Sequence, residues 1–247
     1  MSVALSFFEQ AWPTWLEFWA VAPGSLILAG GQLSLSKSLR EWGKWKAGYS
    51  RKIFHVQVFL TAAYLGHTLG LGSLCVYGVA VSLWVGWSLL DPKGLGRALI
   101  REEDFPHGRR YVILPYLSTL LGGLVCQGLL GTGATVGLLI VGVCDAIAEP
   151  VGLRWGRHPY RWPKIPWLRE SKRTWEGSVA ILVSSLMIFL WGGFEIGLIG
   201  LGWLIWSLIG SLGVTLVESL SPHGMDNFTL QIFGAGWIVM GMSTLPF

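Results

Sequence analysis

Long uninterrupted apolar stretches constrain the fold of this chain more than any other feature of its sequence. Each is about 20 residues long, the length that an α-helix needs to cross the hydrocarbon core of a bilayer. Hydrophobic residues make up 52% of the 247 positions and charged residues only 13%. Soluble domains typically carry about 25% charged residues, so a single water-soluble globule is excluded. The sequence predicts an all-α, polytopic integral membrane protein.

The apolar stretches predict about eight transmembrane helices, with seven as the alternative number. The expected spans are 16–36, 53–70, 72–90, 111–131, 134–153, 178–194, 196–218 and 228–247. Short glycine-containing turns at Gly70–Ser73, Gly131–Gly133 and Gly192–Glu195 predict three helical hairpins. The sequence has no internal repeat and no long polar region, so we expect a single polytopic domain over residues 1–247.

The basic residues predict the orientation in the membrane. All 18 Lys and Arg lie in or beside the first, third and fifth connections, which the positive-inside rule assigns to the cytoplasm. The net charge of +4 is therefore a topology signal, and we expect no nucleic-acid partner. The three cysteines lie in apolar stretches and indicate no disulfide framework. Because no basic leader opens the chain, we expect a bacterial or cyanobacterial inner or thylakoid membrane, with the active face cytoplasmic.

Two acidic residues, Asp145 and Glu149, stand four positions apart in the fifth apolar stretch and would share one helix face. An ionised carboxylate at membrane depth costs about 2.5–3.5 kcal/mol. Acids kept at such a cost are functional by default, so we expect them to bind a cation or to handle a proton. In the alternative interpretation, they lie near the cytoplasmic end, where Arg154 and Arg157 neutralise them.

The connection after this stretch, 154–177, carries seven basic residues with aromatic residues among them. Its three prolines exclude a continuous helix. Arginines offer bidentate hydrogen bonds to phosphate oxygens. Ordinary positive-inside charge in contact with anionic lipid is the alternative. The neighbouring acids favour phosphate binding, because phosphoryl transfer needs carboxylates, Mg²⁺ and a basic cradle.

Two further groups of polar residues lie beside other spans. Arg51, Lys52 and His55 begin the second span, where the histidine is either a solvated end group or a phosphate ligand or proton relay. Glu218, Asp226 and Asn227 flank the last cytoplasmic loop and offer oxygen ligands that could complete a metal site, although a helix cap explains Asp226 equally well. P-loop, zincin and Cys-x-x-Cys motifs are absent.

The order and spacing of these motifs resemble those of the CTP-dependent polyprenol kinases, the family of phytol, farnesol and dolichol kinases, with the phytol kinases nearest. The family's Arg-Lys-x-x-His element is matched by Arg51, Lys52 and His55. Its Asp-x-x-Ala-x-x-x-Gly-x-x-x-Gly element is matched by Asp145, Ala148, Gly152 and Gly156. Its Lys-Ser/Thr-x-Glu-Gly-Ser element and its late Glu and Asp-Asn pair are matched by Thr174, Glu176, Gly177, Ser178, Glu218, Asp226 and Asn227. The sequence departs from the family at Cys144, where Gly is usual, and at Arg173, where Lys is usual.

The resemblance implies a kinase that transfers a phosphoryl group from CTP to a long-chain isoprenoid alcohol. Phytol is the first choice of acceptor, giving phytyl phosphate within tocopherol biosynthesis, and dolichol, farnesol, geranylgeraniol or diacylglycerol are the alternatives. The implied partners are the lipid alcohol, the nucleotide and membrane lipids, with Mg²⁺ as cofactor.

The same resemblance assigns roles to individual residues. The expected catalytic residues are Asp145, Glu149, His55 and Glu176, and the expected metal ligands are Asp145, Glu149, Asp226 and Asn227. The expected nucleotide-binding residues are Arg51, Lys52, Gly152, Gly156, Arg157, Lys172, Arg173, Thr174 and Gly177. A proton-coupled transporter is the alternative from another class, in which Asp145 and Glu149 form a proton relay. The absence of repeated halves argues against it.

Overall fold

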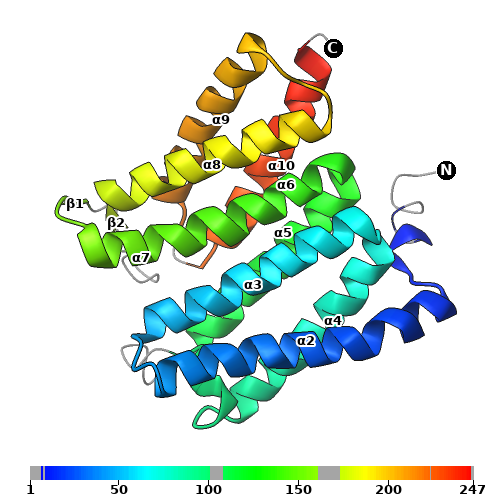
Figure 1. Ribbon diagram of the computed structural model, residues 1–247, viewed down its shortest axis with the longest axis vertical. Helices are drawn as coiled ribbons and strands as arrows, with labels where there is room; N and C mark the ends of the chain where they lie inside the picture. The colour runs from blue at the N-terminus through cyan, green and yellow to red at the C-terminus, as the bar shows by residue number, and fades with distance from the viewer. Residues whose placement is uncertain (1–6, 8, 101–107, 161–172, 223, 246–247) are drawn as a thin grey trace. The chain divides into compact units, whose positions relative to one another are not determined.

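The computed structural model describes residues 7, 9–100, 108–160, 173–222 and 224–245, and within these ranges most residues are helical (Figure 1). The chain divides into two compact units, Met1–Ile113 and Leu114–Phe247, which we call unit 1 and unit 2. The boundary falls in the first turn of helix α5 (Arg110–Leu129). The expectation of one domain over the whole chain stays a prediction.

Unit 1 is built from three long helices and one short 3₁₀ helix. These are α2 (Trp15–Glu41), α3 (Ala47–Thr68), α4 (Leu71–Leu90) and η1 (Leu95–Ala98). A capping box begins α2, because the Thr14 hydroxyl accepts from the Glu17 N–H at 3.2 Å while the Glu17 carboxylate accepts from the Thr14 N–H at 2.8 Å. Gly70, with a φ of 87°, makes the turn into α4, which confirms the hairpin predicted there.

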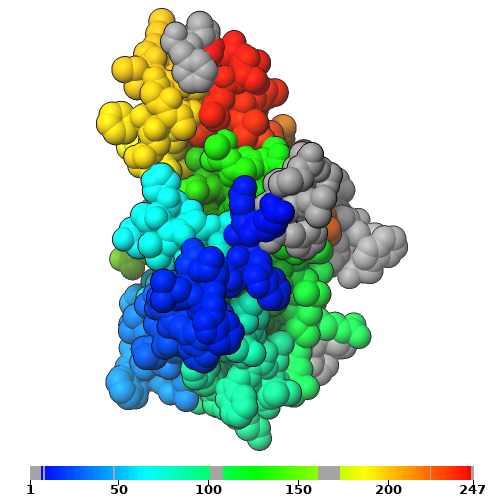
Figure 2. Space-filling view, turned by 90° about the vertical axis from the view of Figure 1, so that its right-hand side faces the viewer, coloured from blue at the N-terminus to red at the C-terminus, as the bar shows by residue number. Residues whose placement is uncertain are grey.

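A buried chain of polar side chains joins the three long helices of unit 1. The Tyr77 hydroxyl donates to Gln32 Oε1 at 2.6 Å, and Gln32 Nε2 donates to Thr61 Oγ1 at 2.9 Å. Each polar group in an apolar interior thereby gains a partner that water would otherwise supply. Large apolar side chains of α2, including Trp15, Leu16 and Ile27, remain on the surface, and Figure 2 shows the N-terminal part of this helix in blue.

Unit 2 contains the remaining helices and the one sheet found in the described residues. Its elements after α5 are η3 (Gly131–Gly133), α6 (Ala134–Leu139), the π-helix η4 (Ile140–Asp145), α7 (Ala146–Trp155), β1 (Pro159–Tyr160), β2 (Arg173–Thr174), α8 (Trp175–Glu195), α9 (Leu201–Leu220) and α10 (Asp226–Thr244). From η3 to α7 the chain is one continuous span of 25 residues with a π-helical segment inside it. The short hairpin β1–β2 was not predicted.

Glycines and buried amides set the packing of unit 2. A Cβ atom at Gly137 would stand 2.6 Å from the Gln231 carbonyl, so this glycine lets α6 lie directly on α10. Gln231 itself is fully buried, and its Nε2 donates to the Thr119 carbonyl at 3.2 Å and to the Asn227 carbonyl at 2.9 Å. The amide thus ties α10 to α5, as polar side chains commonly do between helices in membranes.

Each of the eight predicted spans corresponds to a helix of the described chain, when α6 to α7 are taken as one. Six of them are long and apolar enough to cross a membrane, namely α2, α4, α5, the span from η3 to α7, α8 and α9. The other two, α3 and α10, carry polar residues such as Arg51 and Asp226 near their starts. The chain is a multi-pass integral membrane protein.

The hairpin turn predicted at Gly192–Glu195 is wrong in its position. The helix α8 continues to Glu195, and the turn follows at Gly197 and Gly200, whose φ angles are 76° and 102°. Gly193 lies inside the helix, and no larger residue fits there, because a Cβ atom would stand 1.8 Å from the Trp203 indole nitrogen. That indole donates to the Phe189 carbonyl at 3.0 Å. The glycine therefore serves close packing of α8 on α9, and the turn lies where φ is positive.

Candidate functional site

A short β-hairpin joins α7 to α8 at one end of unit 2. Its strands pair antiparallel, with Pro159 opposite Thr174 and Tyr160 opposite Arg173. Residues 161–172 lie between the strands and outside the described residues, and so does Lys172 of the expected nucleotide-binding set. The pairing brings both ends of this basic segment to the start of α8.

Arg173 anchors the hairpin to the end of α9. Its Nε lies 2.8 Å from Glu218 Oε1, and the two side chains are only 10% and 11% exposed. Its two terminal nitrogens donate to the carbonyls of Ser219 and Ser221. Ser219 lies in the last turn of α9 and Ser221 is its C-cap, and backbone carbonyls at a helix end have no N–H donor within the helix. The guanidinium is engaged on three sides by protein, and nucleotide binding by Arg173 stays a prediction.

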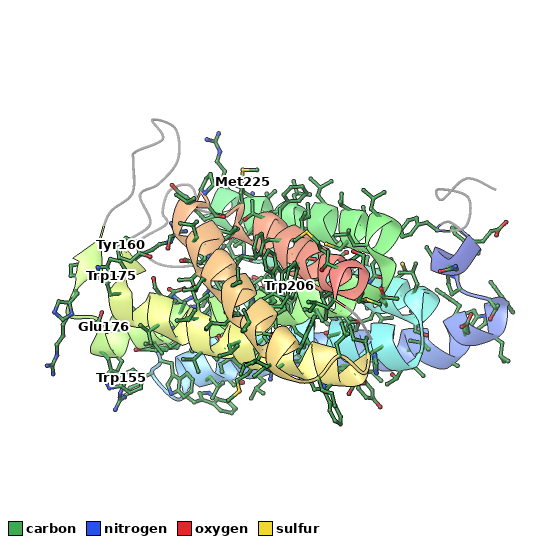
Figure 3. The ribbon with its side chains drawn as sticks, turned by 90° about the horizontal axis from the view of Figure 1, so that it is seen from above. Trp155, Tyr160, Trp175, Glu176, Trp206 and Met225 are labelled. Atoms are coloured by element: carbon green, nitrogen blue, oxygen red, sulfur yellow. The ribbon has the colours of Figure 1, made fainter. Side chains whose placement is uncertain are left out.

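Tyr160 fastens the hairpin to two helices at once. Its hydroxyl lies 2.7 Å from Ser178 Oγ of α8 and 2.8 Å from Ser219 Oγ of α9. Its ring centroid is 5.3 Å from that of Trp175, and Figure 3 shows Tyr160, Trp175 and Glu176 at the same end of α8. Sequence reasoning did not single out this tyrosine, because nothing in the local pattern indicates a partner 59 residues away.

Glu176, an expected catalytic residue, holds the turn that follows α7. Its carboxylate accepts from the Arg157 N–H at 3.0 Å and lies 2.8 Å from His158 Nδ1. Thr174 caps α8 by accepting from the Gly177 N–H at 3.1 Å. We call Tyr160, Arg173, Thr174 and Glu176 the hairpin frame, because their contacts hold the hairpin on α8 and α9.

Three glycines of the expected nucleotide-binding set lie where α7 meets α8. A Cβ atom would stand 2.9 Å from Thr174 Oγ1 at Gly152 and 2.6 Å from Thr174 Cγ2 at Gly156. At Gly177 it would stand 3.1 Å from the Ala148 carbonyl. Close packing of two helices explains these glycines, since protein atoms fill the space in front of them. Their contact with a nucleotide stays a prediction.

Carboxylates from three elements interact electrostatically near the hairpin frame. Asp145 is the last residue of η4, Glu218 lies in the last turn of α9, and Asp226 begins α10. The negative charges of Asp145 and Asp226 both act on Glu218, which is itself paired with Arg173. Glu149 follows Asp145 by one turn, in the first turn of α7, and both are partly buried. Short π-helical segments often occur at functional sites.

Asn227, an expected metal ligand, has its amide nitrogen engaged elsewhere. Its Nδ2 donates to Thr119 Oγ1 at 2.7 Å and to the Pro115 carbonyl at 3.2 Å, which ties α10 to α5. In the part of the chain that the structure describes, no three His, Cys, Asp or Glu side chains form a group able to hold a metal. Asn227 is not one of these residue types, and the expected metal site of Asp145, Glu149, Asp226 and Asn227 stays a prediction. Mg²⁺ in phosphoryl transfer often needs only one or two protein carboxylates together with the substrate phosphates.

The remaining predicted residues lie on the two units separately. Arg51, Lys52 and His55 occupy the N-terminal half of α3 in unit 1, where the His55 ring centroid lies 4.6 Å from that of Phe59. Their approach to the carboxylates of unit 2 stays a prediction. The Arg157 side chain is exposed at the end of α7, beside the hairpin frame.

One comparison with known proteins finds a similarity over nearly the whole chain. The sequence is 27% identical over 239 residues to a protein named phytol kinase from Synechocystis sp.. The alignment covers 92% of this chain and 94% of that protein, so it is not confined to one motif. No family model matches the sequence, and no solved structure matches it.

Proposed function

We propose that this chain, which is related to the polyprenol and phytol kinases, is a membrane kinase that phosphorylates a prenol-type alcohol. The electrostatic effect of Asp145 and Asp226 on Glu218, which is paired with Arg173 of the hairpin, carries the proposal. We further propose CTP as the phosphoryl donor and phytol as the acceptor. The 27% identity to a phytol kinase supports this choice of acceptor.

The proposed reaction exchanges one phosphorus–oxygen bond for another. The hydroxyl oxygen of the alcohol bonds to the γ-phosphorus of CTP, the bond from that phosphorus to the β,γ-bridging oxygen breaks, and CDP leaves. The hydroxyl proton passes to a carboxylate, for which we propose Glu149. An alcohol dissolved in the bilayer presents its hydroxyl at the end of the membrane spans, and Glu149 lies near the end of one, in the first turn of α7.

The acidic and basic side chains of the expected site have distinct proposed tasks. Asp145 and Asp226 would hold Mg²⁺, which would neutralise negative charge on the β- and γ-phosphates. Glu218 is already paired with Arg173, so its proposed task is to hold the hairpin against α9 rather than to bind a cation. Exposed Arg157 would donate to a phosphate oxygen at the rim of the site. Arg51 and Lys52, the other expected nucleotide-binding cations, lie in α3 of unit 1.

Phosphate transfer by the purified protein in detergent tests the proposal. Mg²⁺ and γ-labelled CTP or ATP are offered with phytol, geranylgeraniol, farnesol, dolichol and diacylglycerol in parallel. We expect label from CTP on phytol. Label on another prenol would keep the kinase and correct the acceptor, whereas no label on any acceptor by a folded protein would contradict the kinase.

The variant Asp145→Asn tests the site within the same assay. We expect turnover to fall about 100-fold or more, the usual cost of removing one charge-stabilising group from an active site. Asp91→Asn is the matched control, because Asp91 caps η1 in unit 1 through the N–H groups of Gly94 and Leu95. Full turnover of Asp145→Asn in a folded protein would remove Asp145 from the mechanism.

A further inference from the structure

Unit 1 contains a cleft lined mainly by basic residues, and the proposed kinase reaction does not use these residues. It has a volume of about 530 Å³ and is lined by Arg40, Glu41, Lys44, Trp45 and Arg97. Sites for small molecules commonly measure about 300–1,000 Å³. We propose that this cleft binds the phosphate of an anionic phospholipid headgroup.

The walls of the cleft are fixed by hydrogen bonds between α2 and η1. Arg40 Nη1 donates to the Arg97 carbonyl and, at 2.7 Å, to the Ile100 carbonyl. Asp91 in turn accepts from the Gly94 N–H at 2.9 Å and orders the start of η1. These bonds fix the backbone of η1 against the end of α2, and the side chains of Lys44 and Arg97 stay exposed at the open mouth of the cleft.

The charge of the cleft favours an anion. Three of its side chains are cationic and one is a carboxylate, and that carboxylate, on Glu41, already lies 3.5 Å from Arg97 Nη1. Among the residues that the structure describes, Lys44 has no ion-pair partner, so its ammonium group is available to a ligand. A phosphate would complete the set by meeting Lys44 and the exposed edge of Arg97.

Lys44 is held in an unusual backbone conformation. Its φ is 52°, and it is the one non-glycine residue with a positive φ among the described residues. Glycine and asparagine adopt this left-handed conformation most readily, whereas lysine seldom does. Residues held in such rarely populated backbone conformations cluster at ligand-binding sites. A lysine at a position that suits glycine therefore supports a binding role for its side chain.

The position of the cleft selects a lipid headgroup as the source of the phosphate. Both α2 and α4 are membrane spans, and the cleft lies just past the end of α2 and beside η1, which follows α4. Trp42 and Trp45 are 84% and 43% exposed there, as is typical of side chains at headgroup depth. Basic pockets at the ends of transmembrane helices bind anionic headgroups by this combination of charge and depth.

Thermal unfolding of the purified full chain in detergent tests this proposal without using kinase activity. The protein is titrated separately with dioctanoyl phosphatidylglycerol, dioctanoyl phosphatidylcholine and inorganic phosphate. We expect phosphatidylglycerol to raise Tm, with little effect from the other two. Failure of the kinase proposal would leave this result unchanged.

Two matched variants locate the effect. Lys44→Asn removes the charge with a residue that accepts a φ of 52°, and Lys46→Asn removes an equal charge two positions away, outside the cleft. We expect Lys44→Asn to weaken phosphatidylglycerol binding about fivefold, or about 1 kcal/mol for one lysine near an anionic headgroup, and Lys46→Asn less than twofold. Lys44→Gly, which also accepts this φ, replaces Lys44→Asn if the latter does not fold.

Three outcomes would overturn the proposal. Equal losses in the two variants would mean that diffuse surface charge attracts the lipid. An equal Tm shift with phosphatidylcholine would mean that acyl chains alone bind. A shift with inorganic phosphate that Lys44→Asn abolishes would make the cleft a site for free anions.

Discussion

The ion pair between Arg173 and Glu218 predicts a large loss of stability when the arginine is removed. In Arg173→Met, the carboxylate of Glu218 would stay 11% exposed without its partner, and the carbonyls of Ser219 and Ser221 would lose their donor. Removing one member of a buried pair costs about 3–5 kcal/mol, because the other charge is left without compensation. For a chain of this size, each kcal/mol lowers Tm by about 2–4 °C, so we expect a fall of about 6–20 °C.

A double-mutant cycle separates this ion pair from a general effect of the substitution. Glu218→Gln removes the stranded charge, so Arg173→Met combined with Glu218→Gln should be more stable than Arg173→Met alone. Arg154→Met is the matched control, because the Arg154 side chain is exposed and its guanidinium carbon lies 5.3 Å from the Trp155 ring centroid. We expect this variant to change the free energy of unfolding by less than about 0.5 kcal/mol. Thermal unfolding in one detergent measures five proteins, namely the unsubstituted chain, the two single variants of the pair, their double variant and Arg154→Met. Equal stability of Arg173→Met and Arg154→Met would refute the assignment of Arg173 to the hairpin frame.

Two further variants test other contacts of the same end of unit 2. Gly156→Ala places a Cβ atom 2.3 Å from the Gly152 carbonyl oxygen and 2.6 Å from Thr174 Cγ2, and it should lower stability by about 1–3 kcal/mol. Gly86→Ala meets nothing within 4 Å and should be neutral or stabilising, so equal Tm values for the two variants would contradict steric crowding as the reason for Gly156. Tyr160→Phe removes the hydroxyl that bonds to Ser178 and Ser219, and it should lower the free energy of unfolding by about 1–3 kcal/mol. Tyr64→Phe, on an exposed ring, should not change it, and unfolding in denaturant measures both variants.

The membrane spans could be predicted from sequence because a single physical quantity determines them. Burying about 20 apolar residues in lipid decides where a helix crosses, and neighbouring helices change that decision little. The predicted span 72–90 became α4, Leu71–Leu90, and 111–131 became α5, Arg110–Leu129. The turn predicted at Gly192 failed because a glycine inside a helix and a glycine in a turn look alike in sequence. Only the contact with Trp203 tells them apart.

The candidate site could be predicted as a set of residues and not as a set of contacts. Asp145 was recognisable because an acid in an apolar stretch is costly wherever its neighbours lie. The partner of Arg173 was not, because Glu218 is 45 residues away and tertiary packing alone brings them together. The π-helical segment before Asp145 was also unforeseen, because its residues Ile140–Asp145 include no proline and follow the apolar pattern of an ordinary span.

The residues that carry the family resemblance differ in what surrounds them. Thr174, Glu176 and Arg173 have partners that explain them as parts of the hairpin frame, through a helix cap, a turn and an ion pair. The like charges of Asp145 and Asp226 act on Glu218, which is unfavourable for folding. The proposed function gives these two acids a further task, which is to bind the cation that accompanies the nucleotide. Neutral substitutions at frame residues should therefore act mainly on Tm, whereas neutral substitutions at Asp145 and Asp226 should lower turnover by more than any change in Tm accounts for.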